Sequence, residues 1–461
     1  MDIGRLCLSM SRFFKEPVPP RGQRAREDGI LRHAFAPMEG LFPGMDTTLW
    51  TCLPFPLLLL FIAVLPLAVP HFWEKNSNKA IVSAVVSLPI LIYTWTTCPH
   101  ELLATLEEYV SFILLLASLF IISGGILVKG DLRATPLVNT AFLGIGAVAA
   151  NLIGTTGASM VLIRPLLQTI GERKHIIHIP VFFIFIVSNI GGCLTPLGDP
   201  PLFLGYLRGV PFTWTLRLFP QWIVTIALLL IIFYIWDTLS YRREARLDIE
   251  HDIEAQTPLT ISGKRNFLFL VIVVLAVFFQ TPVPYRELIM VGASLLSLSC
   301  TGKEIRAENG FTFHPINEVA ILFAGIFVTM VPLLSLLQAK GASLGVTEPW
   351  HFFWVTGGLS SFLDNAPTYV TLTSLAESVT RSTGQAGAIV TGIGVRADLL
   401  TAISCGAVFM GANTYIGNGP NLMVKSIAEE QGFRVPHFFE YMLYSGMILI
   451  PIFIVVTFIF F

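Results

Sequence analysis

The chain has 461 residues, of which 54% are hydrophobic and 13% are charged, and its mean hydropathy is +0.72. Soluble domains carry roughly 25% charged residues, so this composition excludes a soluble globule and indicates a protein that crosses a membrane several times. The net charge of −1 gives no sign of a nucleic-acid partner. Six cysteines are scattered without a CxxC pair, which argues against a disulfide framework or a metal cluster.

Residues 1–49 differ in kind from the rest of the chain. Residues 1–44 contain seven Lys or Arg and no apolar run. Because no apolar stretch directly follows these charges, the segment does not have the pattern of a signal peptide. We expect either a disordered basic tail or a translation start at Met38 or Met45, just ahead of the first span.

Ten apolar runs approach the roughly 20 residues that a helix needs to cross a bilayer. We expect transmembrane helices at 52–70, 79–97, 107–128, 176–192, 214–237, 264–281, 286–300, 316–336, 398–412 and 440–461. Two further apolar stretches contain a polar break, ANLIGTTGAS at 150–159 and SSFLDNAPTY at 360–369. Two apolar arms around a polar tip predict a re-entrant hairpin, which survives at membrane depth only when it is buried in protein or lines a wet cavity.

The two halves of the chain repeat one short pattern. GCLTPLGDPP at 192–201 aligns with GANTYIGNGP at 411–420, so that Asp199 falls on Asn418. Each pattern interrupts an apolar run with Gly and Pro, which predicts a broken helix. We therefore expect an all-α polytopic membrane protein with an inverted repeat, in which each half has five transmembrane helices, one re-entrant hairpin and one broken helix.

The repeat defines the expected domains. Residues 50–237 and 264–461 form the two halves, and the charged segment 238–263 links them. Five spans per half require that the second half be inverted relative to the first. Loops on the side of the linker hold roughly twice as many Lys and Arg as the opposite loops, which predicts a cytoplasmic linker and a protein of the cell (inner) membrane.

Hairpin tips and broken helices can together form an ion site. A helix that ends inside the membrane leaves free carbonyl groups and the partial charges of its ends, and inverted repeats bring such ends together at the midplane. Hard oxygen ligands suit sodium. The expected sodium-binding or substrate-binding residues are Asn151, Thr155, Thr156, Ser188, Asn189, Thr195, Asn365, Thr368, Asn413, Thr414 and Asn418.

Asp199 and Asp364 are the strongest candidates for proton and cation coupling. A carboxylate at the centre of a membrane costs roughly 2.5–3.5 kcal/mol on insertion scales and is usually retained for function. A single Asn or Thr is as often a bond between helices as a ligand. His175 and His178 resemble a metal pair, but we expect both to lie at the membrane interface, where they snorkel or cap a helix.

At this point the chain resembles a known family. SNIGGCLTPLGDPPLF, SSFLDNAPTY and GANTYIGNGPNLMVKSIAEE are similar to the motifs of the ion transporter superfamily, and the resemblance covers about residues 50–461. This superfamily includes NhaD-type sodium/proton antiporters, citrate-metal carriers, divalent anion/sodium symporters and arsenite permeases, and the NhaD-like branch has the nearest pattern. The resemblance implies a scaffold and a transport domain in each protomer, a homodimer, and sodium at the two hairpin–break clusters.

These observations predict a secondary transporter that exchanges sodium for protons by alternating access, with no cofactor besides the transported sodium. A carboxylate that is buried among amides holds protons more readily, so that sodium and protons compete for it. The alternative is a sodium- or proton-coupled citrate or dicarboxylate transporter, although the four tip and break motifs contain no Arg or Lys. An intramembrane aspartyl protease is disfavoured, because Pro196 and Leu363 stand where its motifs need Gly and Tyr.

Overall fold

The computed structural model describes residues 49–244, 257–383, 389–390 and 392–461. The basic tail, except for its last residue, and the central part of the predicted linker lie outside the described residues, so the structure does not test the expectations for them. Thr47–Phe461 form one compact unit.

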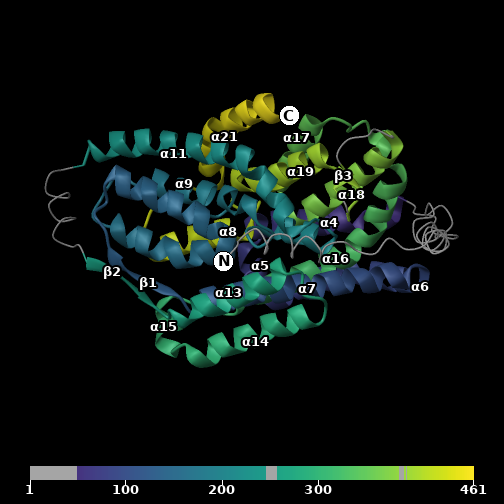
Figure 1. Cartoon of the computed structure of the whole chain (residues 1–461), viewed down its shortest axis with the longest axis horizontal. Helices are drawn as coiled ribbons and strands as arrows, with labels where there is room; N and C mark the ends of the chain where they lie inside the picture. The colour runs from purple at the N-terminus through teal and green to yellow at the C-terminus, as the bar shows by residue number, and fades with distance from the viewer. Residues whose placement is uncertain (1–48, 245–256, 384–388, 391) are drawn as a thin grey trace, which may run out of the picture. The chain divides into compact units, whose positions relative to one another are not determined.

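Helices make up most of the described chain (Figure 1). The α-helices of the first half are α3 (Leu49–Cys52), α4 (Pro54–Ala68), α5 (Pro70–Trp73), α6 (Asn76–Thr97), α7 (Pro99–Ser123), α8 (Pro136–Thr169), α9 (His178–Ile186), α10 (Pro200–Leu207) and α11 (Phe219–Tyr241). The 3-10 helices of this half are η2 (Ile190–Leu194) and η3 (Phe212–Leu218).

The second half consists of a similar set of helices. Its α-helices are α13 (Arg265–Phe278), α14 (Tyr285–Cys300), α15 (Lys303–Glu308), α16 (His314–Lys340), α17 (Pro349–Ser360), α18 (Asn365–Thr383), α19 (Ala397–Met410), α20 (Gly419–Glu430) and α21 (Phe438–Phe460). Its 3-10 helices are η4 (Gly341–Leu344) and η5 (Gly411–Asn413). Within the described residues, six helices are long and apolar enough to cross a membrane and four apolar helices are shorter. The prediction of an all-α polytopic membrane protein is confirmed.

Two short strand pairs were not predicted from the sequence. Strand β1 (Leu127–Asp131) pairs antiparallel with β2 (Thr257–Ser262), so that Leu127 lies opposite Ser262. Strand β2 falls in the predicted linker, and it therefore ties the linker to the first half of the chain (Figure 1). A second pair joins β3 (Ile389–Val390) to β4 (Val395–Arg396).

Helix α8 is a hairpin. Gly154 interrupts it with φ 77° and ψ 155°, a left-handed conformation that favours glycine. The two ends of α8 meet, because the backbone N–H of Leu132 donates to the Thr169 hydroxyl at 3.3 Å and Arg173 donates to the Ala134 carbonyl at 3.1 Å. The chain therefore turns back at the break that the sequence predicted. Entry and exit of this hairpin on one membrane face stays a prediction.

The two predicted helix breaks have matching backbones. After η2 the chain is extended at Thr195 and again at Asp199, and α10 then begins with Pro200. After η5 the chain is extended at Thr414 and again at Asn418, and α20 then begins at Gly419 with Pro420 next. A proline suits the first turn of a helix, because the N–H that it lacks has no helical partner there. Each break thus ends one helix and starts another.

Two pairs of glycines close these breaks. A Cβ atom built on Gly198 would overlap the carbonyl oxygen of Gly192, and one built on Gly417 would lie 2.6 Å from the carbonyl oxygen of Gly411. Both loops therefore depend on backbone-to-backbone contact. The equivalent glycines of the two halves thus make the same kind of backbone contact.

The Gly198→Ala variant is predicted to lower the melting temperature of the purified protein in detergent. The added methyl group must displace backbone, and overpacking of this kind costs about 1–3 kcal/mol. Gly292→Ala is the matched control, since no heavy atom lies within 4 Å of the Cβ position there. Equal melting temperatures for the two variants would contradict the close packing at the first break.

Candidate functional site

The carboxylate of Asp199 is the centre of a buried polar cluster. Its side chain is 1% exposed. Oxygen Oδ1 accepts hydrogen bonds from the Thr155 hydroxyl at 2.9 Å and from Asn418 Nδ2 at 3.1 Å, and Oδ2 accepts one from Asn365 Nδ2 at 2.5 Å. All three donors are neutral. The carboxylate is therefore solvated by the protein but is not neutralised by these partners.

Four separate segments position this cluster. Thr155 directly follows the Gly154 turn of α8, and Asn365 is the first residue of α18. Asp199 and Asn418 are the N-cap residues of α10 and α20. The structure thus brings together one residue from each hairpin and one from each break. These residues come from both halves of the chain.

Within the described part of the chain, no Lys or Arg pairs with Asp199. Burial of an ionised carboxylate without a counter-charge is costly, and such a group is normally neutralised by a proton or a cation. Hydroxyl and amide donors stabilise the carboxylate but add no charge. The Asp199 centre can therefore hold either a proton or a small cation.

A chain of asparagines connects the two breaks behind Asp199. Asn418 Nδ2 also lies 3.2 Å from Asn189 Oδ1, and Asn189 donates to Asn421 Oδ1 at 2.7 Å. Asn421 in turn donates to the carbonyl oxygens of Gly411 and Thr414, each at 2.9 Å. Sequence reasoning missed Asn421, although it lies three residues after Asn418 in the motif GNGPN and so shares a helix face with it.

The first hairpin tip is bonded to the first break. Asn151 accepts a hydrogen bond from the Leu194 backbone N–H at 2.7 Å and donates to the Gly191 carbonyl at 2.6 Å. The Thr195 hydroxyl donates to the Asn151 carbonyl at 2.5 Å. Asn151 and Thr195 therefore hold the loop that carries Asp199. Neither side chain is bonded to Asp199.

The second half has equivalent contacts. The Thr414 hydroxyl donates to the Ser361 carbonyl, as the Thr195 hydroxyl does to the Asn151 carbonyl. Asn413 Nδ2 donates to the Ser361 hydroxyl at 2.9 Å. The two hairpin donors to Asp199 lie four residues further along the chain: Thr155 follows Asn151, and Asn365 follows Ser361. The equivalence supports the proposed repeat between residues 50–237 and 264–461.

Three predicted residues lie at the edge of the cluster. Asp364 is partly exposed, and its Oδ1 accepts a hydrogen bond from the Ala366 backbone N–H at 3.0 Å rather than from a partner of Asp199. The Thr368 hydroxyl donates to the Asp364 carbonyl at 2.9 Å, as in ordinary helix packing. Thr156 is also partly exposed. Asn365, not Asp364, is thus the tip residue that contacts Asp199.

Ser188 contributes to the cluster mainly through its backbone. Its carbonyl accepts a hydrogen bond from Asn418 Nδ2 at 3.3 Å. Its hydroxyl lies 2.8 Å from the hydroxyl of Ser159, which belongs to the second arm of α8. The first broken helix is therefore bonded both to the first hairpin and to the second break.

Two amide oxygens near the tips have no hydrogen-bond donor among the described residues. These are Oδ1 of Asn365 and Oδ1 of Asn413, and both atoms are buried. Most buried polar atoms have a partner, so an unpartnered acceptor calls for an explanation. Amide oxygens are hard ligands that suit sodium and similar cations. A cation bound at either atom would supply the missing partner.

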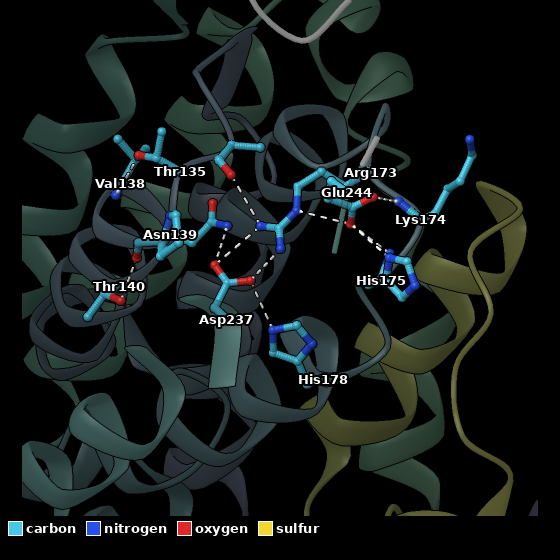
Figure 2. Close-up of polar contacts among 12 residues, drawn as sticks. Thr135, Val138, Asn139, Thr140, Arg173, Lys174, His175, His178, Asp237 and Glu244 are labelled. Carbon is cyan, nitrogen blue, oxygen red and sulfur yellow. Dashed lines mark hydrogen bonds and ion pairs between the residues drawn. The ribbon is translucent and has the colours of Figure 1, made fainter. Parts of the chain in front are cut away.

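A second buried polar cluster lies at the end of α11 (Figure 2). Asp237 accepts hydrogen bonds from Arg173 at 2.7 and 3.2 Å and from Asn139 Nδ2 at 3.0 Å, and its Oδ1 lies 3.0 Å from His178 Nε2. The expectation that His178 snorkels is wrong, because its side chain is 1% exposed; its place at the membrane interface stays a prediction. The burial follows from its contact with Asp237, which lies far away in the sequence.

The fold is that of an all-α polytopic membrane protein. The protein family described as "Putative citrate transport" matches residues 44–461, and the chain belongs to this family. Membership agrees with the resemblance to the ion transporter superfamily, and the description of the family supports a secondary transporter. No curated protein matches the sequence at a significant level.

The Thr155→Val variant is predicted to lower the melting temperature of the purified protein, because a hydrogen bond to a charged group contributes about 1.5–3 kcal/mol. Thr371→Val is the matched control, since among the described residues the Thr371 hydroxyl is bonded only to the Pro367 carbonyl of its own helix. Thermal unfolding in detergent compares the two. Equal decreases in melting temperature for the two variants would show that the hydrogen bond from Thr155 to Asp199 stabilises the protein no more than a hydrogen bond within one helix.

Proposed function

We propose that the chain is a cation-coupled secondary transporter of the cell (inner) membrane that exchanges sodium for protons by alternating access. The observation that carries this proposal is the Asp199 carboxylate, which is buried and hydrogen-bonded by neutral donors from both halves. Such a group needs one positive charge and can take it from either ion. Competition between the two ions for one carboxylate is the basis of exchange.

Each ion would use the cluster differently. Sodium would be bound by the Asp199 carboxylate and by the unpartnered amide oxygens of Asn365 and Asn413. Without sodium, a proton on the carboxylate would neutralise the buried charge. Asp364, which precedes Asn365 and is partly exposed, would serve as the second carboxylate on the path of the ions. Sodium is here the transported substrate, and no resident cofactor is required.

Alternating access requires that the site lie between parts that can move against the rest of the protein. Asp199 and its three donors come from the two hairpins and the two breaks, which are the elements expected to move in transporters with inverted repeats. The cluster therefore contains residues from both halves of the chain, and a movement of either half would change it. A homodimer, in which each protomer transports independently, agrees with this arrangement and is part of the proposal.

A second candidate function is the cation-coupled transport of citrate. The description of the family favours it. Citrate is an anion, and no Lys or Arg within the described residues contacts Asp199, so its binding would depend on a cation bound there first. In this case the same centre would couple the cation to the anion, rather than exchange it for a proton.

The Asp199→Asn variant is predicted to abolish sodium/proton exchange, because the amide is neutral and does not take up a proton, so the two ions no longer compete for one negative charge. Asp364→Asn is predicted to abolish exchange or to reduce it strongly. Sodium-dependent collapse of an imposed pH gradient in proteoliposomes measures both. Asp398→Asn is the control, since Asp398 pairs with Arg396 away from the cluster. Exchange at the wild-type rate and pH dependence by Asp199→Asn would remove this residue from the mechanism.

The choice between sodium and citrate is tested with the same proteoliposomes. We expect sodium alone to collapse the pH gradient and citrate to have no effect in its absence. We also expect Thr155→Val to raise the sodium concentration for half-maximal exchange roughly tenfold, since about 1.5 kcal/mol of carboxylate stabilisation is lost. Accumulation of labelled citrate that needs sodium, without any pH change on sodium alone, would instead establish the second candidate.

A further inference from the structure

The chain of asparagines behind Asp199 has a direction. The carboxamide of an asparagine has one end that donates hydrogen bonds and one end that accepts them, and the surrounding partners decide which end faces which neighbour. The side chains of Asn421, Asn189 and Asn418 are buried, so each end needs a suitable partner within the protein. The partners of each amide therefore fix the order of donors and acceptors along the chain.

The backbone of the second break orients Asn421. Its Nδ2 donates to the carbonyl oxygens of Gly411 and Thr414, each at 2.9 Å. Because a carbonyl oxygen can only accept, the nitrogen must face these two groups and Oδ1 must face the opposite way. The oxygen of Asn421 is therefore held as an acceptor toward Asn189.

The orientation of Asn189 follows from that of Asn421. Its Nδ2 donates to Asn421 Oδ1 at 2.7 Å and to the Ile184 carbonyl at 2.8 Å. Its Oδ1 is left as an acceptor, and Asn418 Nδ2 lies 3.2 Å away from it. Asn418 must therefore turn its nitrogen, rather than its oxygen, toward Asn189.

The same nitrogen of Asn418 serves Asp199. It lies 3.1 Å from Asp199 Oδ1 and 3.3 Å from the Ser188 carbonyl, which favours the same orientation. In the reversed orientation the oxygen of Asn418 would face a carboxylate oxygen, and two acceptors at this distance repel each other. The chain of asparagines thus stabilises the carboxylate that a cation binds.

We propose that Asn421 is a positioning residue of the ion centre, because it holds Asn418, through Asn189, as a donor to the Asp199 carboxylate that binds sodium. Asn421 lies three residues after Asn418 on α20, whereas Asn189 comes from the first half, so this relay joins the two breaks. Asn421 itself is not bonded to Asp199 and acts through its two neighbours. Its role in sodium binding rests on the proposed function, whereas the orientation of Asn418 does not.

The Asn421→Ala variant tests the role in sodium binding. We expect it to raise the sodium concentration for half-maximal exchange in proteoliposomes roughly fivefold, because about one neutral hydrogen bond is lost, while the maximal rate stays close to that of the wild type. The sodium-dependent rise in the melting temperature of the purified protein should shift by the same factor. Sodium dependence equal to that of the wild type in both measurements would overturn the proposal.

Asn266→Ala is the matched control. Asn266 is equally buried and also donates to two carbonyl oxygens, at 2.8 and 3.0 Å, but these belong to Gly125 and Gly263 rather than to the relay. We expect this variant to lower the melting temperature about as much as Asn421→Ala and to leave the sodium dependence unchanged. An equal shift in sodium dependence for the two variants would indicate a general loss of stability and would overturn the proposal too.

A double-mutant cycle without sodium tests the relay independently of transport. Residues without contact or shared partners have nearly additive effects on stability. We expect the decrease in melting temperature caused by Asn421→Ala to be smaller in the Asp199→Asn background, because the neutral amide there needs less stabilisation from Asn418. Additive decreases would overturn the proposal.

The cycle also separates this proposal from the proposed function. A non-additive cycle in a protein whose wild type shows no sodium-dependent exchange would contradict the proposed function and leave the orienting role of Asn421 in place. If Asn421→Ala shows no cooperative unfolding, Asn421→Ser replaces it in every measurement, since the shorter side chain keeps a hydroxyl group in the site.

Discussion

The contact between the Asp199 carboxylate and its three neutral donors is the constraint on which the rest of the structure depends. Thr155, Asn365 and Asn418 reach this carboxylate from segments far apart in the sequence. Hydrogen bonds stabilise a buried carboxylate, but they do not remove its charge. The segments that carry the donors must therefore lie close to the two carboxylate oxygens of Asp199. The carboxylate still needs a proton or a cation to balance its charge.

The helix breaks allow the Asp199 carboxylate to reach its three donors. A continuous helix would direct Asp199 along its face and would satisfy the surrounding backbone groups internally. Instead, glycines let the backbones of each break touch, and prolines start the following helix without an unused N–H. The side chains of Asp199 and Asn418 thus project from helix starts, and they face the hairpin tips rather than the lipid.

The two buried polar clusters differ in charge balance, and this difference separates their roles. At the end of α11, Arg173 and Asp237 form an ion pair with bonds of 2.7 and 3.2 Å, and Glu244 adds a second carboxylate. That cluster is internally compensated, so it can hold loops in place without any ligand. The Asp199 centre has no such counter-charge within the described residues, which is why we assign ion binding to it.

The sequence by itself determined the membrane class, the approximate positions of most apolar helices and the places where helices break, because hydropathy and the backbone limits of Gly and Pro act locally. It also aligned Asp199 with Asn418. Only the tertiary structure decided which neighbours contact the carboxylate: Thr155 rather than Thr156, and Asn365 rather than Asp364. Adjacent residues in a turn point in different directions, and long-range packing alone selects between them. The burial of His178 against Asp237 depends on the same kind of long-range contact.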